Sequence, residues 1–206
     1  MDRTWKPQTT GPAEKLRPVV LVHGIFDTSK IFTPMAKWLT KSGFRPLAPS
    51  LTPSNGTVGL DKLSAQLAAF VDQRLSPGQD FDVVGFSMGG LISRYYVQRL
   101  GGMGRVRRLI TISSPHHGSY VAYTMRNHGT KQMRPGSAFL KDLNRDATTL
   151  ERIRFASIWT PLDLMIMPAN SSRLSVGEEF RILVALHPWM LRSGRVLNLV
   201  TGLLRV

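Results

Sequence analysis

The sequence alternates between short apolar runs and longer segments with helical periodicity. Strands buried on both faces form continuous apolar runs, whereas an amphipathic helix repeats its apolar residues every three to four positions. RPVVLV at residues 17–22 is a run of the first kind, and it ends at a glycine turn. Residues 60–75 are of the second kind, with apolar side chains at Leu60, Leu63, Leu67 and Val71. This alternation predicts an α/β fold with a mostly parallel sheet covered by helices on both faces.

The same patterns predict where each element lies. Strands are expected at residues 17–22, 44–48, 81–86, 106–113, 154–160 and 179–186. Helices are expected at residues 29–41, 60–75, 87–100, 135–143 and 188–204, with an irregular segment over 116–134. No internal repeat or linker interrupts the chain, so we predict a single domain over residues 1–206 with a polar N-terminal extension at 1–16. Parallel sheets bind ligands at the carboxyl ends of their strands, so the residues after each strand are the candidates for chemistry.

Composition limits that chemistry. The 206 residues include no Cys, which excludes disulfides, thiol nucleophiles and Cys-ligated zinc or iron–sulfur centres. The N-terminal residues are polar, and no apolar run approaches the roughly 18 residues of a membrane span. We therefore expect no signal peptide and no transmembrane helix, and a cytoplasmic location with peripheral membrane contact.

The formal net charge of +14 points to an anionic partner. Residues 83–141 contain no Asp or Glu, and they include basic side chains throughout. This stretch is either an ordinary solvated basic face or the footprint of an anionic lipid surface. Nucleic acid is not expected, because no helix-turn-helix, zinc-finger or RNA-binding pattern is present. The basic residues of the stretch are Arg94, Arg99, Arg105, Arg107, Arg108, Arg126, Lys131, Arg134 and Lys141.

The strand expected at residues 81–86 leads into Gly85-Phe86-Ser87-Met88-Gly89-Gly90. This matches G-x-S-x-G, in which a nucleophilic serine occupies a sharp turn between a strand and a helix. Glycines on either side leave room for that turn. The pattern alone is weak, but an apolar strand before it and an amphipathic helix after it are the context that it requires. The alternative is a plain strand–helix turn in which Ser87 caps the helix.

A nucleophilic serine needs a base, and the base needs an acid that orients it. In the strand–elbow–helix arrangement, the acid and then the histidine follow the serine along the chain. Asp163 is the one downstream acid that follows the carboxyl end of an expected strand, and His187 is the one histidine after it. We predict Ser87, Asp163 and His187 as the triad. His116 and His117 also follow a strand, and they remain the competing bases.

The first strand ends in His23-Gly24-Ile25-Phe26. A tetrahedral oxyanion needs two backbone N–H donors. We assign one to Met88, the residue after the nucleophile, and the other to Ile25 in this first loop. The side chains expected to line the site are His23, Gly24, Phe26 and His116.

With these residues in place, the chain resembles the small bacterial lipases and esterases of the α/β-hydrolase superfamily over about residues 17–204. VLVHGIF is similar to their oxyanion strand and loop, and VVGFSMGG to their elbow. ISSPHHGS, QMRPGSAFLKDLN and SIWTPLDLMIMP resemble three later segments, in the same order. The resemblance implies a minimal α/β-hydrolase with little or no lid, and ester hydrolysis by the triad without a metal or organic cofactor.

The function expected is therefore a carboxylic-ester hydrolase that releases fatty acid from acyl lipids through an acyl-enzyme. An acyltransferase or a thioesterase would use the same triad with a different acceptor or leaving group. A non-catalytic scaffold that binds membranes or proteins is an alternative of a different class. The sequence leaves the acyl-chain length and the head group open.

Overall fold

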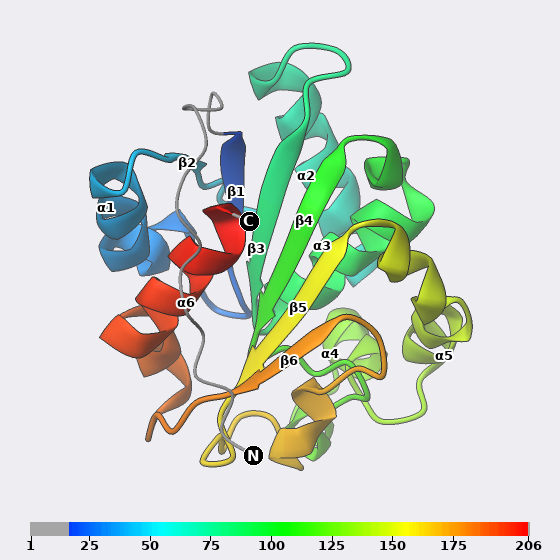
Figure 1. The fold of residues 1–206 in the computed structure, drawn as a ribbon. Coiled ribbons are helices and arrows are strands. Elements are labelled where there is room, and N and C mark those ends of the chain that lie inside the picture. The colour runs from blue at the N-terminus through cyan, green and yellow to red at the C-terminus, as the bar shows by residue number, and fades with distance from the viewer. Residues whose placement is uncertain (1–16, 206) are drawn as a thin grey trace.

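The computed structural model describes residues 17–205, and its strands form one six-stranded sheet (Figure 1). The strand order is β2-β1-β3-β4-β5-β6, and every neighbouring pair is parallel. All the carboxyl ends therefore lie along one edge of the sheet. The strands are β1 (Pro18–Val22), β2 (Arg45–Leu47), β3 (Phe81–Phe86), β4 (Val106–Ile112), β5 (Arg154–Trp159) and β6 (Glu178–Arg181).

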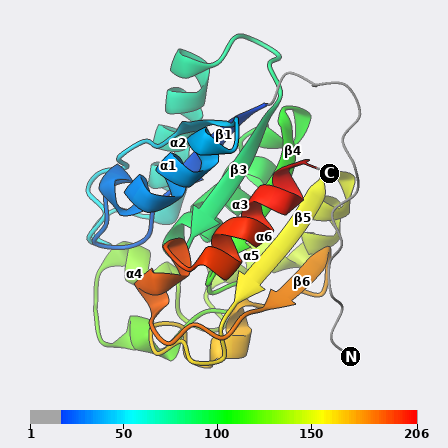
Figure 2. The ribbon, with the colours of Figure 1, turned by 60° about the vertical axis from the view of Figure 1, so that its left-hand side comes forward.

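Helices cover both faces of this sheet. On one face lie α1 (Thr33–Lys41) and α6 (Gly194–Arg205), which cross in front of the strands in Figure 2. On the other face lie α2 (Leu60–Arg74), α3 (Met88–Arg99) and α5 (Ala138–Arg145). The short helix α4 (His128–Gln132) follows β4. The predicted fold class, a parallel α/β sheet with helices on both faces, is confirmed.

The residues of β1 explain why both faces are covered. Val19 and Leu21 belong to the apolar cluster on the α1 and α6 side, whereas Val20 and Val22 belong to the cluster on the α2 and α3 side. Successive side chains of a strand point to opposite faces, so a run of apolar residues needs an apolar layer on each side. All four of these side chains have an exposure of 0%.

Several elements differ from the sequence prediction. The helix expected over 29–41 is divided into the 3₁₀ turn η1 (Ser29–Phe32) and α1, and the helix expected over 135–143 is α5, at Ala138–Arg145. The last strand was expected over 179–186, but β6 ends at Arg181, because the chain then leaves the ladder and Thr160 Oγ1 donates a hydrogen bond to Val184 O at 2.8 Å. The last helix was expected over 188–204. It is instead divided into the 3₁₀ turn η6 (His187–Leu191) and α6. The predicted extension at residues 1–16 lies outside the described residues.

The irregular segment predicted over 116–134 contains η3 (Tyr120–Tyr123) and α4. The remaining 3₁₀ turns are η2 (Gly102–Gly104), η4 (Ala147–Arg152) and η5 (Ala169–Ser172). Within residues 17–205, no helix is both long enough and apolar enough to cross a membrane.

The basic stretch of residues 83–141 does not form one face. Arg105, Arg107 and Arg108 lie where β4 begins, at the edge opposite the strand ends, and each forms an ion pair with an aspartate from outside the stretch. Arg94 is fully buried, and Arg99 pairs with two aspartates of the α5 region. Five of the nine basic residues of this stretch are therefore buried or paired within the protein. The four other basic residues of the stretch are Arg126, Lys131, Arg134 and Lys141.

Candidate active site

Ser87 lies in the tight turn between β3 and α3. Its backbone angles are φ 54° and ψ −126°, and non-glycine residues rarely adopt a positive φ. The Ser87 N–H donates to Ile112 O at the end of β4, at 2.9 Å. Strained backbone of this kind persists only where the surrounding structure enforces it, and it is frequent at active sites.

Close packing explains the glycines of the G-x-S-x-G pattern. A Cβ at Gly85 would lie 2.6 Å from Gly90 Cα. A Cβ at Gly89 would overlap the carbonyl oxygen of Val22 at the end of β1. Gly85 therefore lets β3 pack closely against the first turn of α3, and Gly89 lets that turn approach the end of β1.

The structure brings Asp163 and His187 together from loops that follow β5 and β6. His187 Nδ1 lies 2.7 Å from Asp163 Oδ2, and both residues are buried. The second carboxylate oxygen, Asp163 Oδ1, accepts the backbone N–H groups of Met165 at 2.9 Å and Ile166 at 3.0 Å. Because ionised Asp163 can only accept, His187 carries its proton on Nδ1 and leaves Nε2 as an acceptor.

The same contacts set the charge of Asp163. Burial alone would raise the pKa of this carboxyl group. The hydrogen bond and charge of His187 and the two backbone N–H groups outweigh burial and hold the pKa below its ordinary value. Asp163 is therefore ionised at neutral pH.

His187 lies beside the nucleophile elbow. Its ring centroid is 4.7 Å from that of Phe86, the residue before Ser87. Among residues 17–205, no hydrogen bond joins Ser87 Oγ to His187. Hydrogen bonds between nucleophile and base are often long in unliganded enzymes and shorten in the substrate complex.

The loop after β1 packs against Ser87. His23 is fully buried; its Nε2 accepts the Leu51 N–H at 2.9 Å, so Nδ1 carries the proton and donates to Gly24 O at 2.9 Å. Burial lowers the pKa of His23, which keeps the ring neutral. A Cβ at Gly24 would lie 3.0 Å from Ser87 Cβ, so only a glycine lets this loop approach so closely.

Two backbone N–H groups near Ser87 are free to bind a ligand. Within the described part of the chain, neither the Ile25 N–H nor the Met88 N–H donates a hydrogen bond. They are the two groups predicted to form the oxyanion hole. The neighbouring Phe26 has φ 59° and is 63% exposed, so its ring projects into solvent beside them.

His116 lies in the interior rather than at the mouth of the site. It is fully buried, with Nδ1 3.3 Å from Arg94 Nη1 and Nε2 3.0 Å from Thr111 Oγ1. Its backbone carbonyl accepts Asn144 Nδ2 at 2.9 Å. Burial, with the charge of Arg94, lowers the pKa of His116 well below its usual value. Both ring nitrogens are occupied, which argues against His116 as the alternative base and gives it a packing role between α3 and α5.

Sequence reasoning passed over Asp27, whose carboxylate lies beside Gly24. The sequence signal that could have identified Asp27 as a residue near the site is an acidic side chain a few positions after the first strand. For metal binding, the described residues contain no group of three or more His, Asp or Glu side chains that could hold an ion.

Comparison with solved structures supports the fold. The mature lipase BlEst2 of Bacillus licheniformis superposes with a TM-score of 0.76 at 17% identity, over 97% of this chain and 96% of that chain. Lipase B of Aspergillus fumigatus superposes with a TM-score of 0.75 at 16% identity, over 90% of this chain and 51% of its own. At these identities the likeness shows a shared fold, that of α/β-hydrolases among lipases and esterases.

Sequence relatives are also acyl hydrolases. A triacylglycerol lipase of Pseudarthrobacter phenanthrenivorans is 31% identical over 113 residues, which are 51% of this chain and 35% of the lipase. Palmitoyl-protein thioesterase 3 of Dictyostelium discoideum is 28% identical over 116 residues, 50% of this chain and 37% of its own. The match thus spans about a third of the length of these curated relatives.

The family model described as palmitoyl protein thioesterase matches residues 18–156. This range contains the loop after β1 and the elbow, and it ends before Asp163 and His187. The chain therefore belongs to the palmitoyl protein thioesterase family, within the lipase, esterase and thioesterase type of α/β-hydrolase.

Proposed function

We propose that this protein hydrolyses fatty acyl esters with Ser87 as nucleophile, His187 as general base and Asp163 as the acid that orients it. The observation that carries the proposal is the 2.7 Å contact between His187 Nδ1 and Asp163 Oδ2, beside a strained serine elbow. Asp163 fixes the tautomer in which His187 Nε2 can accept the Ser87 hydroxyl proton.

In the first step, Ser87 Oγ attacks the acyl carbonyl carbon while His187 Nε2 takes its proton. The Ile25 and Met88 N–H groups would stabilise the negative oxygen of the tetrahedral intermediate. His187 then returns the proton to the leaving group, and the carbonyl re-forms as an acyl-enzyme. Water, deprotonated by the same histidine, releases the carboxylic acid and restores Ser87.

Exposed apolar side chains favour a fatty acyl substrate. Among the described residues, every exposed large apolar side chain except Trp38 and Leu100 lies on a loop that follows a strand's carboxyl end. A contiguous exposed apolar area commonly marks a binding surface. The side chains of this apolar rim are Phe26, Tyr120, Tyr123, Leu162, Leu164, Met165, Met167, Leu183, Leu186 and Trp189.

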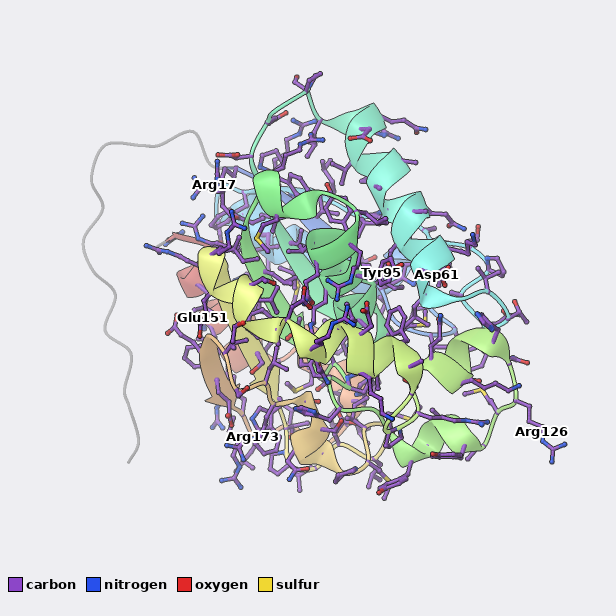
Figure 3. The ribbon with its side chains drawn as sticks, turned by 90° about the vertical axis from the view of Figure 1, so that its right-hand side faces the viewer. Arg17, Asp61, Tyr95, Arg126, Glu151 and Arg173 are labelled. Atoms are coloured by element: carbon purple, nitrogen blue, oxygen red, sulfur yellow. The ribbon has the colours of Figure 1, made fainter. Side chains whose placement is uncertain are left out.

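We also propose that this apolar rim contacts an anionic lipid surface. Arg126, in the loop between η3 and α4, lies toward the end of the molecule that holds the strand ends, while Arg17 lies at the opposite end (Figure 3). Arg173, after η5, lies toward the same end as Arg126, but it pairs with Glu179 at 2.9 Å. Basic side chains near such a surface each contribute about 1 kcal/mol, within roughly 8–10 Å.

A thioester substrate is the second candidate, and the family model favours it. A thiolate leaves more readily than an alkoxide, so the same triad can cleave both. Hydrolysis of an S-acyl and an O-acyl substrate with the same fatty chain would separate the two. If kcat/KM for one substrate exceeded that for the other more than 100-fold, the protein would be assigned as a thioesterase or as an esterase accordingly. Folded protein that cleaves neither substrate would contradict both candidates.

A further inference from the structure

Ser54, in the loop after β2, holds the backbone at Asp27 in place. Phe26 adopts φ 59° and turns the chain sharply before Asp27. Ser54 then fixes both sides of the turn, because Ser54 O accepts the Phe26 N–H at 2.9 Å and Ser54 Oγ donates to Asp27 O at 2.8 Å. Backbone held at two consecutive residues fixes the position from which the Asp27 side chain extends.

This geometry brings the Asp27 carboxylate close to the nucleophile. A Cβ built on Gly24 would lie 3.2 Å from Asp27 Oδ2 and 3.0 Å from Ser87 Cβ. The sum of these two distances is the longest possible separation between the carboxylate oxygen and Ser87 Cβ. A substrate bound for attack by Ser87 therefore passes within reach of Asp27.

The carboxylate has no partner within residues 17–205: it forms neither a hydrogen bond nor an ion pair there. Burial raises the pKa of Asp27 and outweighs the opposite effect of the nearby His23 and His187. His23 is kept neutral by its own burial, so it does not neutralise Asp27. A partly buried charge without a partner costs free energy, which a bound cation or hydrogen-bond donor would recover.

From this placement we propose that Asp27 is a specificity determinant that favours substrates with a cationic or hydrogen-bond-donating group next to the scissile ester and disfavours anionic ones. This inference rests on the proposed hydrolysis at Ser87. The carboxylate attracts a positive group at the site mouth, and it repels a sulfonate, phosphate or carboxylate in the same position. The reaction itself needs no step through Asp27.

The test compares three butyrate esters that differ in leaving-group charge. They are the esters of choline, which is cationic, of its uncharged tert-butyl analogue, and of isethionate, which is anionic. The kcat/KM of each is measured for the wild type, for Asp27→Asn and for the control Asp61→Asn. Asn matches Asp in size but carries no charge. Asp61 is another acid, at the beginning of α2, and its Oδ1 accepts Gln132 Nε2 at 3.2 Å.

In Asp27→Asn, the ratio of kcat/KM for choline butyrate to that for isethionate butyrate should fall by about tenfold, and the wild-type ratio should shrink as salt rises. Asp61→Asn should keep the wild-type ratio. An unchanged ratio in Asp27→Asn, or an equal fall for all three esters, would overturn the role of Asp27. A folded wild type that cleaves none of the esters would instead overturn the proposed function.

Discussion

Replacing Asp163 by Asn tests the orientation of the base. The variant keeps the size of the side chain and one oxygen for the Met165 and Ile166 N–H groups, which lie 2.9 and 3.0 Å from Oδ1. The amide nitrogen would then face His187 Nδ1, 2.7 Å from the present Oδ2 position. Because an amide N–H can only donate, His187 would have to accept on Nδ1 and carry its proton on Nε2. A histidine protonated on Nε2 cannot take the Ser87 proton.

The expected cost follows from this change of tautomer. In a serine protease triad, the same substitution lowers kcat by about 10⁴, which corresponds to about 5.5 kcal/mol of transition-state stabilisation. The assay is turnover of a soluble short-chain p-nitrophenyl ester, with circular dichroism to confirm folding. Asp142→Asn is the matched control, because Asp142 pairs with Arg99 on the surface. If folded Asp163→Asn turned over within tenfold of the wild type, another group would be orienting His187 and the assignment of Asp163 would fail.

The same variant should change how stability depends on pH. The folded-state pKa of Asp163 is lowered, so its ionised form stabilises the fold above the unfolded pKa of about 3.9, and this contribution is lost as pH falls through the lower folded value. The melting temperature of Asp163→Asn should therefore lie below that of the wild type at neutral pH, and the two should converge in strong acid. A difference that persisted unchanged into strong acid would contradict this linkage.

Two further predictions concern the loop after β1 and the lipid surface. Gly24→Val should lower kcat by about 10²–10³, because its Cβ would press on Ser87 Cβ and displace the Ile25 N–H, whereas Gly194→Ala, which meets no atom within 4 Å, should be neutral in ester-hydrolysis assays. Arg126→Glu should weaken co-sedimentation with anionic vesicles in a salt-dependent way, whereas Arg107→Glu, at the opposite edge, should not. An active Gly24→Val, or equal effects of the two arginine variants, would refute the respective assignment.

Most of the fold could be predicted because the residues that become buried are apolar and recur at the spacing typical of a strand or a helix. The runs at 17–22, 81–86 and 106–113 are predominantly apolar, and the observed strands begin and end within a residue of the predicted positions. The last strand was less predictable. FRILVAL is as apolar as a strand, but β6 ends at Arg181, and Val184 instead contacts the side chain of Thr160, which is distant in sequence.

The candidate site likewise contains some features that the sequence predicts and others that depend on contacts in space. The G-x-S-x-G pattern and the order of Asp163 and His187 along the chain are local or sequential signals, so the sequence carries them. Asp27 and the buried contact of Arg94 with His116 depend on which loops meet in space. The ion pairs of Arg105, Arg107 and Arg108 depend on spatial contacts too, so counting the charges of residues 83–141 cannot reveal that they pair with aspartates of neighbouring segments.

Labelling with a fluorophosphonate probe tests the central claim most directly, because the probe reacts with an activated serine and needs no knowledge of the substrate. Mass spectrometry of the labelled wild type should place the probe on Ser87 alone. Labelling should be abolished in Ser87→Ala and strongly slowed in His187→Ala, with both variants folded. Folded wild-type protein that remains unlabelled, or a probe attached to another serine, would contradict the account.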